Sequence, residues 1–405
     1  MSIDRARTVR KVLKAVDSVE PKVAKKDAGL FKSFCAGVAE QLRAPYLERY
    51  GPAGVPGRLR GTFDWIKKRK QGEILVQIVP TGDSRCLVQT CMADQAFIVD
   101  TVRLLVQAYG ARVEAGFNAV LRVKRSSTGV AKIIGDSDLA LESVVQLEVE
   151  GLESADYEVF AQRLRDNLRL SRSMVQDFDE MLKVLDGLAS FFERGARREP
   201  ESAQRYRETA AFINWLLSDN FVFMGLVASE GRFGFEQESL QHLAVAISER
   251  KWAKGAWSDL PIRVRKSVQE SPVHRSGRID EVLIRIPGKN GTDSTDVLIR
   301  GMFTYRAVTQ PSRHVPVLRK VLADILSVDH SRPGSWRYKG MANVFDSLPT
   351  EFLFTASRDQ IGSIIDRVLD AEAEQATGVH FVQDSSGEVS FVLAAMPKSQ
   401  YSDAV

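Results

Sequence analysis

The side chains that most often do chemistry in proteins are scattered in this sequence. Zinc ligands normally recur about two to five residues apart, and histidine is the commonest of them. None of the five histidines has another histidine or a cysteine at that spacing. They are His242, His274, His314, His330 and His380. The spacing therefore predicts no metal site.

Nucleotide chemistry would leave an equally clear signature. A nicotinamide dehydrogenase built on a Rossmann sheet places a GxGxxG turn at a helix N-terminus. The sequence contains not even a GxG, and its nearest glycine pairs, 54/57, 231/234 and 288/291, are too widely spaced. The GxxxxGK[ST] and GxSxG motifs are also absent. No catalytic or cofactor-binding residue is predicted, and we expect this chain alone not to be an enzyme. A Ser-His-Asp or Cys-His group that meets only in space would leave no such motif.

One histidine lies among cations. His274 stands in the segment SPVHRSGRID, next to Arg275 and close to Arg278. This cluster has the charge to bind an acidic effector. The favoured interpretation is a turn that hydrogen-bonds to its own backbone.

The composition narrows the class of protein. The chain has 405 residues, 44% hydrophobic and 27% charged, which is typical of a soluble protein with roughly two to four compact units. A net charge of +4 implies no nucleic-acid partner. No apolar run approaches the roughly 20 residues of a membrane span. Cys86 and Cys91 lie in an apolar run and are expected to be buried thiols, and with Cys35 they make an odd count that suits a cytoplasmic protein.

The elements that would position a site begin with a helical segment over residues 1–60. Helical spacing of apolar residues marks two helices, the second closed by Pro45. A loop rich in glycine and proline is expected over residues 51–61, where it would act as a hinge.

Residues 73–170 have the pattern of a mixed unit. On its last strand Glu142, Gln146 and Glu148 are expected to share one face. The order of elements is most of a split βαββαβ unit of the ferredoxin-like type, which covers one face of an antiparallel sheet with two helices and leaves the other free for pairing. The expected elements are strands at 74–79 and 86–91, a helix at 96–109, strands at 112–124 and 141–149, and a helix from residue 157.

Two further units are expected after a helical linker over residues 171–219. The second mixed unit covers residues 220–328, with strands at 220–227, 281–286 and 296–305, a GKNGT turn and a closing helix at 315–326. The third, over residues 335–405, has a helix at 359–373 and strands at 379–383 and 389–395. It lacks a closing helix and strand, so we expect the chain to end inside this unit.

Five stretches of the sequence resemble one protein family in the same order. MANVFDSLPTEFLF at 341–354 closely resembles a segment of the large bacterial NAD-dependent glutamate dehydrogenases, in their non-catalytic N-terminal region. The matches extend from about residue 75 to residue 405. The other four are AFIVDTVRLLVQAYGARV at 96–113, NWLLSDNFVFMGL at 214–226, VHRSGRIDEVLIR with IRGMFTYRAVTQPSRHVPVLRKVLADIL at 273–326, and FVLAAMPKSQYSDAV at 391–405.

The resemblance implies both a fold and a function. The fold would be α+β, with several ferredoxin-like, ACT-type βαββαβ modules that have antiparallel sheets and are linked by helical segments. Such modules bind amino acids or mediate oligomer contacts in other enzymes. The function would be that of a regulatory or oligomerisation region, whose parent enzyme converts L-glutamate and NAD to 2-oxoglutarate, ammonium and NADH.

The resemblance also implies partners. They would be the downstream catalytic domain of the same polypeptide and neighbouring subunits of a homo-oligomer. NAD would be the cofactor of the parent enzyme, and the family's glutamate-binding and NAD-binding residues lie downstream, so none is placed in this chain.

A small amino-acid effector, if one binds, is expected at the loop before the helix at 96–109. Asp94, Gln95 and Asp100 are the polar groups near its N-terminus, although the favoured interpretation of Asp94 is a residue of the helix-cap region. The loop over residues 92–95 lacks the glycine that amino-acid-binding ACT loops tend to have. Phe and Asn at 117–118 stand where family members often have His-Pro.

Two other functions stay open. A free-standing ACT-type sensor or interaction scaffold would use the same modules with no enzyme attached and would have a complete third sheet. An unrelated hydrolase or transferase would need a site assembled only in space. Activity of the isolated chain would indicate the second of these.

Overall fold

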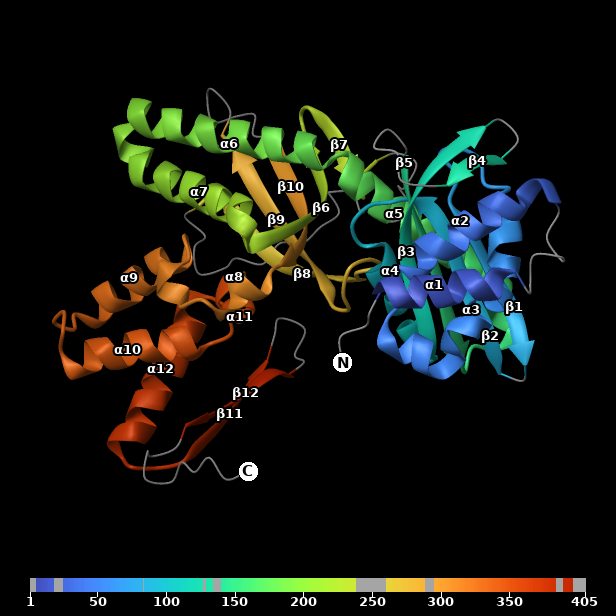
Figure 1. Cartoon of the computed structure of the whole chain (residues 1–405). Helices are drawn as coiled ribbons and strands as arrows, with labels where there is room; N and C mark the ends of the chain where they lie inside the picture. Colours follow the sequence, from blue (N-terminus) through green and yellow to red (C-terminus); the bar gives the residue numbers. More distant parts are fainter. Residues whose placement is uncertain are drawn as a thin grey trace. The chain divides into compact units, whose positions relative to one another are not determined.

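The structure is a computed structural model in which contacts divide the chain into two compact units. Unit 1 holds Met1–Val175 with Ser271–Gly277, and unit 2 holds Gln176–Glu270 with Arg278–Val405. Both combine helices with antiparallel sheets, which confirms the α+β class (Figure 1). The structure describes residues 5–17, 25–82, 84–126, 129–133, 140–237, 260–287, 295–383 and 389–395.

Unit 1 is built on a five-stranded sheet of order β1-β2-β5-β3-β4. The central strand β5 pairs antiparallel with β2 and with β3, and helix α4 (Ile98–Ala108) connects those two. The strands are β1 (Leu75–Gly82), β2 (Arg85–Ala93), β3 (Arg112–Ser126), β4 (Gly129–Ile133) and β5 (Ala140–Glu150).

The ferredoxin-like plan is present with one rearrangement. Elements β2, α4, β3, β5 and α5 (Tyr157–Gln176) follow the predicted order of strand, helix, two strands and helix. The last strand of a ferredoxin-like unit would follow the second helix and pair beside the first strand. Here that edge position is filled by β1, which precedes β2 in the chain and pairs with it as a hairpin.

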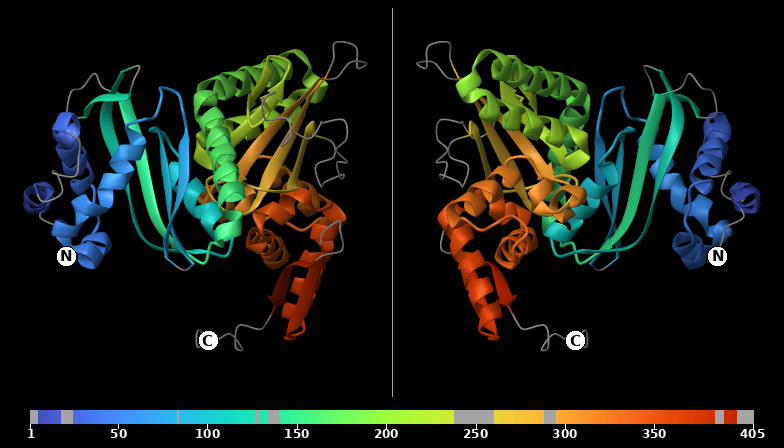
Figure 2. Two further views of the ribbon diagram at one scale, coloured as in Figure 1. Left: turned by 90° about the vertical axis from the view of Figure 1, so that its right-hand side faces the viewer. Right: turned by 90° about the vertical axis from the view of Figure 1, so that its left-hand side faces the viewer.

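The sheet of unit 1 is covered on both faces, as Figure 2 shows. Helices α4 and α5 form one core with apolar side chains of β1, β2 and β5. Helices α1 (Arg5–Val16), α2 (Ala28–Ala39) and α3 (Ala44–Ile66) form a second core on the opposite face. The expectation that one face is left free for pairing was therefore wrong for this unit.

The expected loop over residues 51–61 was also wrong, because these residues lie inside α3. The helix is kinked at Gly51, whose positive φ of 64° separates two helical segments and lets Pro52 begin the second. Pro45 does not close the preceding helix but lies in the first turn of α3. Val55, Leu59, Phe63 and Ile66 recur at helical spacing and are buried, so their packing outweighs the glycine and proline content.

Unit 2 repeats the sheet plan with strands in the order β7-β6-β10-β9-β8. The central β10 pairs antiparallel with β6 and β9, and a hairpin adds one outer strand at each side. The predicted strands at 220–227, 281–286 and 296–305 correspond to β6, β9 and β10. The strands are β6 (Phe221–Ala228), β7 (Gly231–Gly234), β8 (Ile262–Glu270), β9 (Arg278–Ile286) and β10 (Thr295–Phe303).

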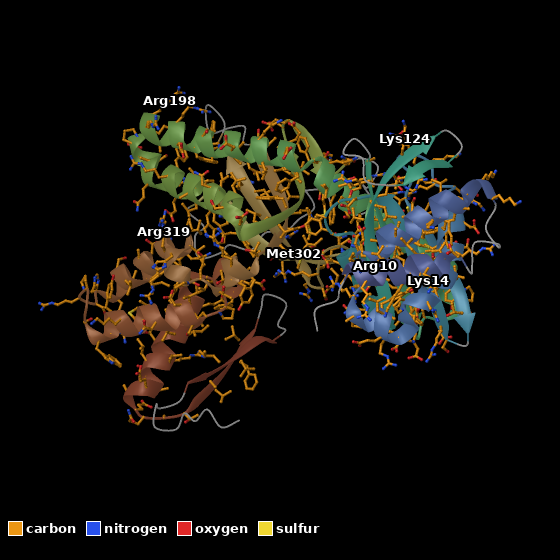
Figure 3. All side chains as sticks on the ribbon, viewed as in Figure 1. Arg10, Lys14, Lys124, Arg198, Met302 and Arg319 are labelled. Carbon is orange, nitrogen blue, oxygen red and sulfur yellow. The ribbon has the colours of Figure 1, made fainter. Side chains whose placement is uncertain are left out.

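The helices of unit 2 share one hydrophobic core with the sheet. Arg319 of α9 pairs with Glu208 of α7 at 2.9 Å, and Figure 3 shows this arginine between the two helices. The β11–β12 hairpin lies next to α12 and contributes Val382 to the core. The elements are α6 (Phe178–Arg198), α7 (Ala203–Trp215), α8 (Tyr305–Thr309), α9 (Leu318–Asp329), α10 (Trp336–Ser347), α11 (Thr350–Thr355), α12 (Arg358–Ala373), β11 (Gly378–Gln383) and β12 (Val389–Ala395).

Several expectations are untested. The GKNGT turn and residues 396–405 lie outside the described residues. The boundaries of the five expected segments, at 1–60, 73–170, 171–219, 220–328 and 335–405, stay a prediction.

Close backbone packing in the sheet of unit 1 gives a stability prediction. A Cβ at Gly116 in β3 would lie 2.4 Å from the carbonyl oxygen of Gln146 and 2.7 Å from a methyl of Leu147. Gly116→Ala is expected to lower the free energy of unfolding by about 1–3 kcal/mol. Gly29→Ala is the control, because a Cβ there meets nothing within 4 Å. Equal midpoints of chemical denaturation for the two variants would contradict this packing.

Candidate functional site

Asp94 and Gln95, two of the residues expected to bind an effector, form hydrogen bonds to neighbouring elements of unit 1. The backbone N–H of Asp94 donates to the carbonyl oxygen of Leu141 at 2.9 Å, and burial raises the pKa of its carboxyl group. Gln95 donates through Nε2 to the hydroxyl of Ser171 in α5, at 3.0 Å. The N-cap of α4 is Phe97, with a φ of 70°, so Asp94 lies ahead of the cap and does not form it.

The third residue, Asp100, lies beside the turn that contains His274. The turn is closed by Ser271, whose N–H donates to Gly277 at 2.9 Å, so the predicted turn bonded to its own backbone is confirmed. The ring of His274 lies edge-on to Phe97, with centroids 5.2 Å apart. Burial and the charge of Arg275 lower the pKa of His274, while Asp100 acts in the opposite direction. The structure thus brings Asp100 near His274 and directs Gln95 to α5.

The most extensive polar arrangement of unit 1 joins α3 to the central strand β5. Three contacts follow one another along the two elements: Arg58 to Glu148 at 3.2 Å, Thr62 to Gln146 at 2.6 Å, and Arg69, just beyond the end of α3, to Glu142 at 2.6 Å. We call this row of contacts the α3–β5 seam. The prediction that Glu142, Gln146 and Glu148 share one face is confirmed, and that face lies against α3.

Glu142 is the more enclosed of the two carboxylates of the seam. Its carboxylate accepts from Arg69 at 2.6 Å and from two nitrogens of Arg125 at 2.5 and 2.6 Å, and these three side chains are 5%, 3% and 7% exposed. The thiol of Cys91 lies 3.7 Å from the same carboxylate, and burial raises the pKa of this thiol to about 12. The cysteines expected to be buried are buried.

Amide groups continue the seam toward the edge of the sheet. Gln89 of β2 donates to Gln146 at 2.8 Å and to Thr62 at 2.7 Å. Its carbonyl oxygen accepts from Gln77 of β1 at 2.5 Å. Above this row lies a groove of about 350 Å³ between α3 and the β1–β2 hairpin, which we call the α3 groove. Its lining residues are Arg58, Gly61, Thr62, Asp64, Trp65, Lys68, Gln77, Val79, Leu87 and Gln89.

Unit 2 contains an ionic group around the buried carboxylate of Asp280. Lys266 of β8 pairs with Asp280 of β9 at 2.8 Å and with Glu351 of α11 at 2.7 Å. Asp280 also accepts from the backbone N–H of Phe303 at 3.0 Å. Burial raises the pKa of Asp280 to about 6 against the opposing effect of Lys266. The group therefore ties three strands to a helix that follows the sheet in the chain.

Two segments of the chain match families of glutamate dehydrogenase domains. Residues 34–164 match the family described as "Glutamate dehydrogenase, ACT1 domain", which spans the whole α3–β5 seam. Residues 315–374 match "Glutamate dehydrogenase, helical motif 1", which covers α9 to α12. Both segments are thus similar to domains of glutamate dehydrogenases. The resemblance found in the sequence is confirmed, and so is the ACT-type, ferredoxin-like description of the fold.

Whole-protein relatives agree with the domain matches. The chain is 24% identical over 333 residues to the "NAD-specific glutamate dehydrogenase" of Halomonas elongata, and 24% identical over 338 residues to the protein of the same name from Pseudomonas aeruginosa. These alignments cover 76% and 78% of this chain. The chain spans about a fifth of the length of each relative, since the aligned part is 21% of either one.

Two other kinds of feature are absent from the described residues. No helix there is long and apolar enough to cross a membrane. No group of three or more His, Cys, Asp or Glu side chains within those residues is placed to hold a metal ion.

The sequence contains a signal for the partners of β5 in the seam. The alternation of Glu142, Gln146 and Glu148 predicts one polar face, whereas the ferredoxin-like pattern predicts a face free for pairing. Arg58 lies in the expected loop over residues 51–61, and Thr62 and Arg69 follow it. Because that stretch is helical, it places these polar side chains opposite the strand.

Removal of the charge of Glu142 tests the seam. Glu142→Gln leaves two buried guanidinium groups without their counter-charge, and we expect it to cost about 3–5 kcal/mol of unfolding free energy. Glu150→Gln on the same strand is the control, because Glu150 pairs with the exposed Arg85 and Arg112. Urea denaturation measures both. A Glu142→Gln midpoint as high as that of the control would show that the seam does not stabilise unit 1.

The buried carboxyl of Asp280 gives a pH prediction. Its folded-state pKa of about 6 lies above the usual value of 3.8, so the unfolded chain loses this proton first as the pH rises. The Asp280 carboxyl group therefore contributes fully to the unfolding free energy below about pH 4. This contribution is lost by about pH 6, and the change is on the order of 3 kcal/mol. Asp280→Asn is expected to lack this fall. If the unfolding free energies of the wild type and of Asp280→Asn change in parallel from pH 4 to pH 7, the raised pKa of Asp280 is contradicted.

Proposed function

We propose that this chain is a regulatory and assembly region of an NAD-dependent glutamate dehydrogenase. The observation that carries the proposal is the presence, in one chain, of two domains that both match glutamate dehydrogenase families. Two relatives named as NAD-specific glutamate dehydrogenases, each far longer than the aligned part, support it. The parent protein would convert L-glutamate and NAD to 2-oxoglutarate, ammonium and NADH in the cytoplasm. NAD would bind in a catalytic domain outside this chain.

The region would act by coupling. A ligand or a neighbouring subunit that binds one arrangement of its modules more tightly than another shifts the population toward it, and the catalytic domain responds to that shift. The partners we propose are that catalytic domain and other copies of the same protein. An amino-acid effector would contact Asp94, Gln95 and Asp100 at the start of α4. The proximity of His274 to Asp100 supports a polar site there.

The first test asks what polypeptide contains this sequence in its source cells. An antibody to this chain, followed by mass spectrometry of the captured protein, is expected to find a species several times heavier than 45.1 kDa that yields dehydrogenase peptides. Capture of a protein near that mass without such peptides would overturn the proposal.

The second test separates regulation from catalysis. The 405-residue chain is expected to form no NADH from L-glutamate and NAD, whereas the captured protein forms it. Deletion of residues 34–164 from the captured protein is expected to change its oligomeric state or its response to amino acids. NADH production by the 405-residue chain would instead indicate a catalytic site within it.

A further inference from the structure

The α3 groove of unit 1 presents hydrogen-bonding groups that the protein itself leaves unused. Its floor is a hydrogen-bonded row made by the amides of Gln77 and Gln89 and the hydroxyl of Thr62, and Gln89 and Thr62 are 2% and 1% exposed. Both N–H groups of Gln89 donate to the seam, and its carbonyl oxygen accepts from Gln77. This fixes the orientation of the Gln77 amide. Its carbonyl oxygen and second N–H have no partner among the described residues.

The rim of the groove supplies an aromatic wall and positive charge. Within the part of the chain that the structure describes, the ammonium of Lys68 and the indole N–H of Trp65 have no polar partner. The one carboxylate of the lining, Asp64, is occupied by Lys67 at 2.8 Å and by Arg60 at 3.8 Å. At the far end Arg58 lies over the ring of Tyr50 and is paired with Glu148. The open groups therefore favour an anion.

The spacing of these groups defines the length of the ligand. Thr62 and Trp65 lie three residues apart on one side of α3, and Lys68 follows two residues beyond the end of the helix. Gln89 ties the Gln77 amide to Thr62, and with a rise of about 1.5 Å per residue the last helical residue, Ile66, lies roughly 6 Å further along α3. Lys68 lies beyond that level. A ligand that uses all three groups has an amide-like edge, a flat ring and an anionic group, in that order.

We propose that the α3 groove binds a nucleoside monophosphate, with its base between Gln77 and Trp65 and its phosphate on Lys68. A glutamine amide offers the donor and acceptor pair that matches the N6/N7 edge of adenine. Bases stack on aromatic side chains at a gain of about 1–3 kcal/mol each, and a free lysine suits a phosphate. The groove volume of about 350 Å³ lies in the range of small-ligand sites. The proposal goes beyond the dehydrogenase assignment and does not depend on it, because the whole groove lies in unit 1.

Gly61 provides the variant that tests the groove. This glycine lines the groove, and a Cβ there meets nothing within 4 Å, so a larger side chain would occupy the space of the ligand. Gly57 is the matched control, since it lies one turn earlier on α3, has equally open surroundings and does not line the groove. Replacement of either by leucine favours the helix, so both variants are expected to fold.

The experiment is calorimetric titration of AMP into the full 405-residue chain and its variants. Gly61→Leu is expected to weaken AMP binding by at least about 30-fold, while Gly57→Leu binds like the wild type. Lys68→Gln is expected to weaken AMP binding about 10-fold, consistent with one phosphate contact, and to leave adenosine binding unchanged. Lys32→Gln, an exposed lysine of α2, is the charge control.

Three results would overturn the proposal. Wild-type protein that binds neither AMP nor the other nucleoside monophosphates has no nucleotide site. Binding of AMP that Gly61→Leu does not weaken lies elsewhere on the protein. Inorganic phosphate that competes as well as AMP shows that the base makes no contribution, which leaves only an anion site.

Discussion

The burial of a polar face of β5 beneath α3 is the constraint on which unit 1 depends. Apolar side chains such as Val145 and Leu147 face the core of α4 and α5, while Glu142, Gln146 and Glu148 face α3. A slip of one residue would carry the polar side chains into the apolar core. The α3–β5 seam therefore fixes the register of the central strand, and with it the pairing of β2 and β3 on either side. Buried ion pairs often stabilise little compared with apolar packing, so we assign the seam a role in specificity as well as in stability.

The central strand of unit 2 also buries a charged side chain, but there the charge is positive. Its central strand β10 contributes Arg300, a fully buried cation that pairs with Glu236 at 2.9 Å and with Glu281 at 3.3 Å. On the other face of the sheet Lys266 joins Asp280 to Glu351. Both sheets thus combine one strand order with buried charges that are satisfied within their own unit. A charge without such partners would cost several kcal/mol, so these pairs select one packing among many apolar alternatives.

Most elements were predictable from the sequence because their apolar spacing is regular. The strands of β2, β9, β11 and β12 were placed within a few residues, and so was the helix α12. The prediction was wrong where local composition and tertiary packing disagree. Residues 51–61 contain the glycines and prolines of a loop, yet burial of Val55 and Leu59 keeps them helical. The position of β1 at the sheet edge is a matter of pairing between strands, which periodicity does not encode. For the candidate site, the polar residues of β5 were identified, but their partners on α3 were not, because a contact between residues about 80 positions apart leaves no local pattern.

The seam also determines how a signal would leave the α3 groove. Thr62 belongs to both, and Gln89 connects Gln77 at the edge of the groove to Gln146 at the centre of the sheet. Gln146 and Thr62 have few other hydrogen-bonding options in their buried setting, so a ligand that reorients Gln77 must change bonds along the whole row. The row ends on the strand that also holds Glu142 between Arg69 and Arg125. Ligand binding at the edge of the sheet would therefore change hydrogen bonds at the central strand, without unfolding of either core. This is a physical route by which the central strand of unit 1 would respond to a ligand in the α3 groove.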